Sequence, residues 1–327
     1  MQLEFAKELQ EVTTEKGREP FFIEPKKRVA FAQIAKNYLL LTKPTIMILV
    51  VFSGAVALFL EGSILTEPIK CIAILLAVYL TGGSANALNQ YFERDIDAKM
   101  SRTQNRRPLP QGLIAPNSAL VFIISIGSVG ILIFGVFFNW LSAFITLSTI
   151  LFYGLFYTLY LKPNTPQNIV IGGAAGAMAP IGVWAAITGQ VGVEAVLLFL
   201  IVFLWTPPHF WALALYCKDD YIKAGLPMLP VVKGDRETLK QMIYYTVILF
   251  IITIALAIVH QGFFFWASSV ILGLIFIKKT IGGLKNTSVP YLRSLFGFSI
   301  IYLFSLFIAL IADKLTQNLL RQISNNF

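Results

Sequence analysis

The stretch IKCIAILLAVYLTGGSANALNQYFERDIDAKM (69–100) begins as an apolar run and ends in a cluster of charged side chains. Its first part, residues 69–91, is long and apolar enough to cross a bilayer, which takes about 20 such residues in a helix. Asn89, Glu93 and Asp97 follow one another at intervals of four, so in a helix their side chains share one face. The stretch therefore predicts a membrane-spanning helix with a polar site at one end.

The chemistry of that face points to a metal and a diphosphate. Carboxylates are unfavourable at a bilayer boundary unless they bind a partner, and a row of oxygen ligands suits Mg²⁺, which in turn binds diphosphates. Guanidinium groups can take up the remaining phosphate charge. We expect Asn89, Glu93 and Asp97 to hold Mg²⁺, with Arg102 and either Arg106 or Arg107 on the diphosphate. The alternative is an ordinary basic loop with solvated salt bridges.

Composition limits the class of protein. Of the 327 residues, 57% are hydrophobic and only 13% are charged, and the mean hydropathy is +0.73. Soluble domains carry about 25% charged residues, so the chain is expected to be a polytopic membrane protein without a nucleic-acid partner. Cys71 and Cys217 form no metal-binding or disulfide pattern. Residues 1–40 are polar and are expected to form a tail without a cleavable signal peptide.

Nine segments are long and apolar enough to span a membrane. We therefore expect an all-α membrane protein with nine transmembrane helices around a central cavity. Residues 41–315 would form one domain, flanked by a tail at 1–40 and a short tail at 316–327. Very short turns at Asn139 and at Gln261-Gly262 predict antiparallel hairpins. The predicted spans are 42–60, 69–91, 117–137, 139–160, 168–188, 193–217, 240–260, 262–280 and 291–313.

The distribution of Lys and Arg orients these spans, because basic residues gather on the cytosolic side. With the N-terminus in the cytosol, all 26 Lys and Arg residues except Lys70, Lys314 and Arg321 fall on that side, and the C-terminus lies outside. The two long polar loops, 92–116 and 218–240, are separated by four spans, which suggests a weak internal repeat. We expect these loops to face each other across the cavity.

A second polar region lies at the end of the sixth span, in LWTPPHFWALALYCKDDYIKAGLPMLPVVKGD (204–235). Pro207 and Pro208 should kink or interrupt that helix and free backbone groups. His209 could bind a haem iron, accept a proton, or hydrogen-bond a freed carbonyl. Asp220 is a candidate second metal ligand or diphosphate organiser, although helix-end solvation would also explain it. Candidate substrate contacts beside it are Tyr221 and Lys223.

Two further lysines lie on the predicted cytosolic side. Lys43, in LTKPT (41–45), could touch a substrate phosphate or extend to lipid headgroups. Lys162, in LKPNTPQN (161–168), could line the mouth of the cavity. The Gly- and Ala-rich segment 168–182 predicts close helix packing.

Four blocks of sequence together resemble the UbiA superfamily of intramembrane prenyltransferases. They are LTKP (41–44), NQYFERDIDAKMSRT (89–103), NIVIGGAAGAMAPIG (168–182), and TPPHFWALA with DYIKAGLPMLPVVKG (206–214 and 220–234). The last pair is similar to the branch of the family that farnesylates haem. The resemblance implies a helical bundle that opens to lipid, Mg²⁺ as cofactor, and farnesyl diphosphate and haem B as substrates.

The resemblance also implies a reaction and a location. A haem vinyl group would attack the farnesyl cation and water would add, giving haem O for terminal oxidase assembly, with His209 as the candidate for orienting haem. A bacterial cytoplasmic (inner) membrane and a downstream haem-modifying enzyme as partner would fit. Two positions depart from the family pattern: Glu93 stands where Asp is common, and Ala224 lies four residues after Asp220, which weakens metal binding by that loop.

Three other functions remain open from the sequence. The nearest is a UbiA-type enzyme that prenylates an aromatic acid or quinone precursor, because the same acidic site would serve it. A membrane transporter is disfavoured, since the charged clusters lie at one face and the centres of spans three, four, five, seven and eight lack charged residues. A haem-binding factor without catalysis would need His209 but not the acidic residues.

Overall fold

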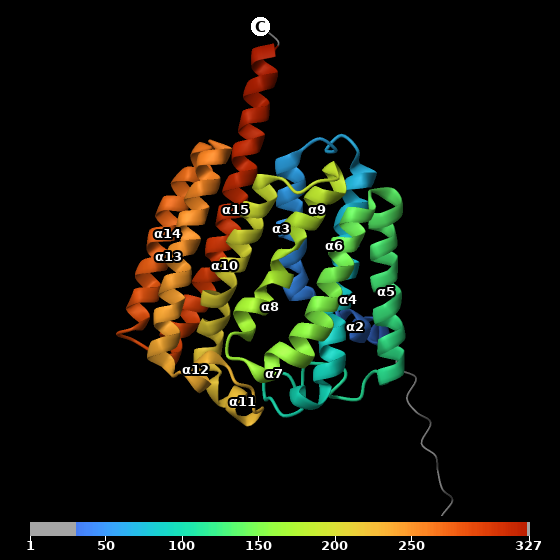
Figure 1. Ribbon diagram of the computed structural model, residues 1–327, viewed down its shortest axis with the longest axis vertical. Helices are drawn as coiled ribbons and strands as arrows, with labels where there is room; N and C mark the ends of the chain where they lie inside the picture. Colours follow the sequence, from blue (N-terminus) through green and yellow to red (C-terminus); the bar gives the residue numbers. More distant parts are fainter. Residues whose placement is uncertain (1–30, 326–327) are drawn as a thin grey trace, which may run out of the picture. The chain divides into compact units, whose positions relative to one another are not determined.

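The computed structural model describes residues 31–325, with side chains as far as residue 320. That part of the chain is helical and contains no strand, and nine of its helical segments are long and apolar enough to cross a membrane (Figure 1). The predicted nine-helix class is therefore confirmed. Most of the predicted 1–40 tail lies outside the described residues, and its last part forms α2 (Phe31–Leu41).

Seven of the nine spans are single helices, and two spans are composite. The single helices before the sixth span are α3 (Pro44–Glu61), α4 (Pro68–Asp97) and α5 (Pro116–Phe137). The fourth span consists of α6 (Trp140–Leu151), the π-helix η1 (Phe152–Leu161) and α7 (Lys162–Asn164). The fifth consists of α8 (Asn168–Ala177) and α9 (Ala179–Thr188). The remaining helices are α10 (Val193–Tyr216), α11 (Lys218–Lys223), α12 (Leu229–Val232), α13 (Asp235–His260), α14 (Phe263–Gly283) and α15 (Val289–Asn325).

Proline and glycine mark several helix ends. Pro44, Pro68 and Pro116 each occupy the first turn of a span, where the missing N–H is not needed. Gly62 ends α3 with a left-handed φ of 84°, a conformation that costs glycine little. α15 is still helical at Asn325, so most of the segment assigned to a C-terminal tail extends the last helix.

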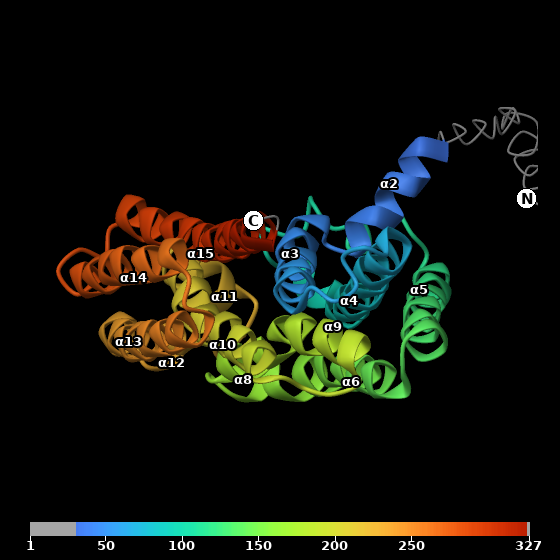
Figure 2. The same cartoon turned by 90° about the horizontal axis from the view of Figure 1, so that it is seen from above.

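Within the unit formed by residues 36–327, α10 lies between two groups of helices (Figure 2). On one side it packs against α13 and α15, and on the other against α8 and α9. The pairs α5–α6 and α13–α14 pack against each other, which confirms the two predicted hairpins. Asn139 caps α6 by accepting the N–H of Ser142 at 3.0 Å, and its amide donates to the carbonyls of Ala185 and Ala186 in α9.

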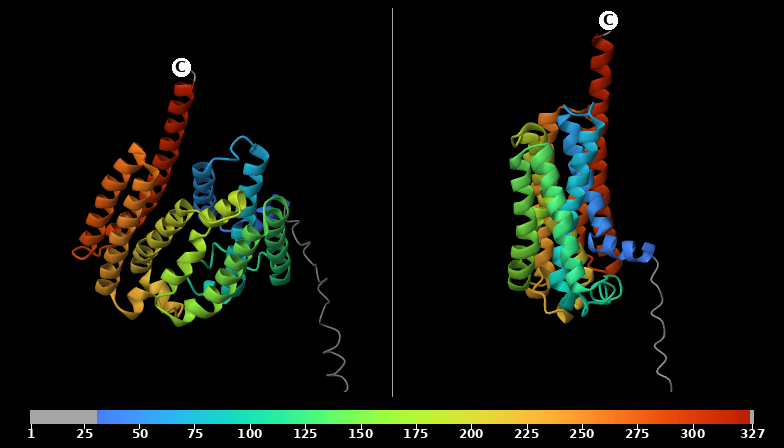
Figure 3. Two further views of the ribbon diagram at one scale, coloured as in Figure 1. Left: turned by 45° about the horizontal axis from the view of Figure 1, so that its top comes forward. Right: turned by 90° about the vertical axis from the view of Figure 1, so that its right-hand side faces the viewer.

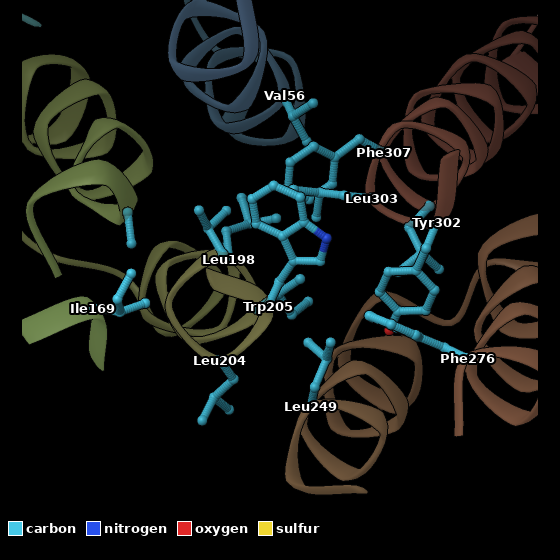
Figure 4. Packing of buried hydrophobic residues seen from close by; sticks show 14 of the residues in the cluster. Val56, Ile169, Leu198, Leu204, Trp205, Leu249, Phe276, Tyr302, Leu303 and Phe307 are labelled. Carbon is cyan, nitrogen blue, oxygen red and sulfur yellow. The ribbon is translucent and has the colours of Figure 1, made fainter. Parts of the chain in front are cut away.

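The interior around α10 is apolar and aromatic. Trp205 of α10 extends between α3 and α15, toward Val56, Leu303 and Phe307 (Figure 4). Its indole N–H donates to the carbonyl oxygen of Ser299 at 2.7 Å, so the one polar atom of this side chain is satisfied inside the core.

Pro207 and Pro208 do not interrupt the sixth span, so of the two effects expected from the sequence, a kink or an interruption, the interruption is wrong. α10 continues through both prolines to Tyr216. It is the most buried of the nine candidate spans, since 67% of its most apolar 18-residue stretch lies inside the protein. Neighbouring helices on several sides hold the backbone helical where two of its own hydrogen bonds are missing.

The bundle has two ends, which differ in their connecting segments (Figure 3). One end carries Asp97, the last residue of the predicted acidic face, and the short helices α7, α11 and α12, and we call it the site end. The far end carries the α3–α4 and α13–α14 connections. There, buried Asp313 of α15 accepts the N–H groups of Phe264 and Phe265 at 2.9 and 2.7 Å, and Lys314 donates to the carbonyl of Leu60 at 2.8 Å.

Candidate active site

The predicted acidic face is formed at the end of α4. The helix does not stop at residue 91 but continues to Asp97, so Asn89, Glu93 and Asp97 lie on its last two turns and face the same way. Each of the three residues is only 2% exposed. Buried carboxylates are unfavourable without partners, so the side chains around them define what the site can do.

Three cations from three other segments reach this face. Lys162, which begins α7, donates to Glu93 at 2.5 Å. Arg107 forms an ion pair with Asp97 and lies 3.6 Å from the other carboxylate oxygen of Glu93. Lys43, which precedes α3, donates to the Oδ1 atom of Asn89 at 2.6 Å. The structure thus brings the three expected ligands together with three of the expected substrate contacts.

Lys43 is held by an unusual backbone conformation. Its φ of 53° is left-handed, which is uncommon for a residue with a side chain and recurs at functional sites. Burial, and next the charge of Arg107, lowers the pKa of the Lys43 ammonium well below its usual value.

The other two arginines of the loop lie differently. Arg106 is exposed and Arg107 is not, so of the two only Arg107 contacts the carboxylates in this structure. Arg102 is half-buried, and its Nε atom is buried without a hydrogen-bond partner. A buried, unpaired guanidinium nitrogen is a site that an anion could complete.

The second polar loop meets the first. Ser101 donates its hydroxyl to the carboxylate of Asp220, with 2.6 and 2.8 Å to the two oxygens, so the two loops face each other as predicted. Asp220 is thus linked to the first loop through a serine hydroxyl. Tyr221 is 4% exposed, and burial raises the pKa of its hydroxyl more than the nearby Arg102 guanidinium lowers it. Lys223 is exposed.

His209 lies deeper in the bundle, between α10 and α15. Its ring stacks between Trp205 and Phe296, with centroids 4.2 and 4.4 Å away, and its Nδ1 atom lies 2.7 Å from the hydroxyl of Ser299. That hydroxyl donates its hydrogen to the Phe296 carbonyl at 2.6 Å, so Nδ1 must be the donor toward it. The bond assigns the Nδ1–H tautomer, which leaves the lone pair on Nε2. His209 is bonded to a side chain, not to a freed carbonyl.

A small apolar cavity of about 60 Å³ lies deeper than the carboxylates. Val78, Gly82 and Ala85 line it, and they precede Asn89 at helical spacing on the same face of α4. Phe134 of α5 and Met178, between α8 and α9, line it as well. One face of α4 thus carries the acidic residues at its end and lines an apolar cavity farther along the helix.

Three polar residues that contact these groups were not predicted from the sequence. Thr158 accepts a hydrogen bond from the Asn89 amide at 3.0 Å, Ser101 binds Asp220, and Ser299 binds His209. Thr158 stands alone in the apolar run FYGLFYTLYL, where a threonine ordinarily bonds to its own helix. Thr158 lies four residues before Lys162, which in a helix places the two on one face, and this spacing is the one signal in the sequence that could have indicated its role.

The donor set fits a hard cation. Glu93 and Asp97 offer carboxylate oxygens and Asn89 offers its amide oxygen, as Mg²⁺ prefers, and positive groups lie beside all three residues. No group of three or more His, Cys, Asp or Glu side chains is placed to hold a metal among residues 31–320. A cation at this face would therefore rely on Asn89 and on ligands from a substrate, as Mg²⁺ bound to phosphates commonly does.

Comparison with known proteins places the chain in a family. The model of the UbiA prenyltransferase family matches residues 49–311. A protoheme IX farnesyltransferase of Brucella anthropi is 42% identical over 291 residues, which are 88% of this chain and 93% of the relative. One of Erythrobacter litoralis is 45% identical over 287 residues, covering 85% and 92%. One of Rhodopseudomonas palustris is 43% identical over 304 residues, covering 90% and 96%.

Solved structures share the fold at low sequence identity. A digeranylgeranylglyceryl phosphate synthase superimposes with a TM-score of 0.72 at 20% identity, over 87% of this chain and 99% of that one. A UbiA homologue from Archaeoglobus fulgidus bound to GPP and Mg²⁺ gives a TM-score of 0.56 at 17% identity, over 84% and 99%. The family match covers most of the chain, and the relatives are similar over almost their whole length. The chain belongs to the UbiA prenyltransferase family.

Proposed function

We propose that this protein transfers the farnesyl group of farnesyl diphosphate to a vinyl group of haem B, with addition of water, to give haem O. The observation that carries the proposal is the pair of buried carboxylates, Glu93 and Asp97, faced by Lys43, Arg107 and Lys162 at the end of an apolar helix bundle. The relatives named protoheme IX farnesyltransferase indicate haem as the acceptor.

The diphosphate would bind at the site end. Asn89, Glu93 and Asp97 would hold Mg²⁺, which neutralises charge on a departing diphosphate when it is bound, and Asp220 is a candidate further ligand. Once a cation occupies the carboxylates, the long side chains of Lys43, Arg107 and Lys162 are free to turn to phosphate oxygens. Arg102, with its unpaired Nε, would complete the phosphate contacts, and exposed Arg106 would add charge at the entrance.

The chemistry separates charge within a dry site. The bond between C1 of the farnesyl chain and the diphosphate oxygen breaks, and the diphosphate keeps the electron pair. The allylic cation is attacked by the vinyl group of haem, which forms a carbon–carbon bond. Water then adds to the new cation and loses a proton. Stabilising the leaving group is the largest catalytic contribution expected, because fixed charges act strongly where water is excluded.

The acceptor would lie beside the second loop. His209 would orient haem through the lone pair on Nε2, on the iron or a polar edge, and Ser299 holds the tautomer that makes this possible. Tyr221 and Lys223 would contact the acceptor or the diphosphate from α11. A haem with a farnesyl tail remains in the bilayer, so a membrane-bound haem-modifying enzyme is the expected next partner.

We also propose an orientation and a domain plan. The site end would face the cytosol of a bacterium, with the N-terminus inside, the C-terminus outside, and the protein in the cytoplasmic membrane. Lys70 and Lys314 are the basic residues of the far end among those described, whereas the other described lysines and arginines lie toward the site end, which supports this assignment. Residues 41–315 would form the catalytic domain between the two tails.

The test is a reconstituted reaction. Purified protein in lipid discs receives Mg²⁺, farnesyl diphosphate and haem B, and the pigments are separated by chromatography and weighed by mass spectrometry. We expect a haem that has gained one farnesyl group and one water, and no product when Mg²⁺ is chelated. The Glu93→Gln protein, which keeps the shape of the side chain but not its charge, serves as the inactive control.

Two results would overturn the proposal. Mg²⁺-dependent prenylation of an aromatic acid, with haem left unchanged, would keep the family chemistry and move the acceptor. If no diphosphate were released with any acceptor, a binding or transport role would replace catalysis.

A further inference from the structure

Thr158 is the residue of η1 that touches the acidic face. It is buried, with 6% exposed, and its hydroxyl makes two hydrogen bonds. It donates to the carbonyl oxygen of Tyr153 at 2.8 Å, and it lies 3.0 Å from the Nδ2 atom of Asn89. Asn89 is itself almost fully buried, so these contacts decide how its amide is turned.

The direction of each bond follows from the number of hydrogens available. A threonine hydroxyl has one hydrogen, and here the Tyr153 carbonyl receives it. Toward Asn89 the hydroxyl can therefore only accept, which requires the NH₂ group of the amide on that side. At the other end of the amide, the ammonium of Lys43 can only donate, which requires the oxygen Oδ1 there, at 2.6 Å. Two independent partners thus assign the same orientation.

The π-helix gives Thr158 an acceptor that an α-helix would not. Buried Thr246 of α13 and Thr280 of α14 bond to carbonyls four residues back, at Met242 and Phe276. Thr158 instead reaches a carbonyl five residues back, within the wider turn of η1. π-turns inside helices occur frequently at functional sites, and this one holds a hydroxyl against the α4 face.

We propose that Thr158 is a positioning residue for Asn89: it binds the amide nitrogen and so keeps Oδ1 turned toward the space between Lys43 and the carboxylates. The inference rests on the proposed function, in which that space receives the magnesium diphosphate. Without the hydroxyl the amide can turn over, and its NH₂ group would then face the cation. Oxygen is a ligand for Mg²⁺ and an NH₂ group is not.

The test compares two substitutions at one position. Thr158→Val removes the hydroxyl and keeps the shape, whereas Thr158→Ser keeps the hydroxyl. Thr280→Val is the matched control, because that threonine is also buried and its hydroxyl donates to a carbonyl of its own helix. Binding of Mg²⁺ in the presence of inorganic diphosphate is measured by calorimetry, together with the melting temperature and the separate kcat and KM values.

We expect Thr158→Val to weaken Mg²⁺ binding about tenfold, the range found when a partner of a metal ligand is removed. Thr158→Ser should restore binding to near the wild-type value, and Thr280→Val should leave it unchanged at a similar melting temperature. Wild-type affinity in Thr158→Val, or equal losses in the valine and serine proteins, would overturn the inference while the proposed function stands. Absence of Mg²⁺ and diphosphate binding in the wild-type protein would overturn both.

Discussion

The two ends of the bundle both bury ionisable side chains, but they satisfy them in different ways. At the far end, Asp313 accepts two backbone N–H groups and Lys314 donates to a backbone carbonyl, so neither partner can move away. At the site end, Glu93 and Asp97 are bound to the flexible tips of Lys162 and Arg107. Backbone partners indicate a structural role, whereas side-chain partners can be exchanged for a ligand.

Glu93→Gln should have the largest effect. It removes a charge from the acidic face while keeping its volume, and we expect kcat to fall about a hundredfold or more, since fixed charges supply much of the catalysis in such a site. The protein should still fold, with a lowered melting temperature, because Lys162 and Arg107 lose a buried anionic partner. Asp97→Asn should behave alike. Full activity in both proteins would end the metal assignment.

Asp313→Asn should produce the opposite pattern at the far end. The amide can accept from only one of the N–H groups of Phe264 and Phe265, so we expect a loss of about 2 kcal/mol in the free energy of unfolding. The kcat of the folded fraction should stay at the wild-type value. Unfolding by dodecyl sulfate in mixed micelles measures the first quantity. A fall in kcat without a fall in stability would contradict the structural role.

Lys162→Met tests whether side-chain partners at the site end can be exchanged for a ligand. It removes the ammonium that is proposed to turn from Glu93 to a phosphate oxygen of the substrate. We expect the KM for farnesyl diphosphate to rise about tenfold, as befits one lost charge-assisted hydrogen bond. The KM for haem should not change. Initial rates over a range of each substrate separate the two. An unchanged KM for the diphosphate would show that Lys162 serves Glu93 alone.

Lys314→Met is the matched change at the far end and should have the smallest effect. Its ammonium donates one hydrogen bond to the Leu60 carbonyl, so we expect a loss of about 1 kcal/mol in the free energy of unfolding. Both KM values should remain at the wild-type level. If Lys314→Met raised the KM for farnesyl diphosphate as much as Lys162→Met, the two ends would not differ in the way described.

The spacing of residues along the sequence predicted the helices and the acidic face, but it did not predict contacts between residues far apart in the chain. The intervals between Asn89, Glu93 and Asp97 required one helical face, and all three are indeed buried together. The apolar runs were long enough to predict every span. By contrast, Glu93 and Lys162 are 69 residues apart, and nothing local to either one indicates that they meet.

Three further features depend on packing and could not be derived from sequence patterns. The choice between Arg106 and Arg107 depends on how the loop folds back onto α4, and the structure places only Arg107 against the carboxylates. The helix through Pro207 and Pro208 survives because its neighbours enclose it, whereas the rule for prolines considers the helix alone. The π-helix η1 lies in a run of apolar residues that an α-helix would accommodate equally well.

That π-helix has a consequence for insertions and deletions. A π-turn holds one more residue than an α-turn, so loss of one residue between Phe152 and Leu161 would let the segment wind as an α-helix. The helical turns on either side would keep their register, but Thr158 would lose the carbonyl five residues back as its acceptor and with it its place against Asn89. We expect a one-residue deletion there to impair diphosphate binding more than any conservative substitution in η1, which binding assays on deletion variants can measure. The length of this segment, and not only its composition, is thus part of the active site.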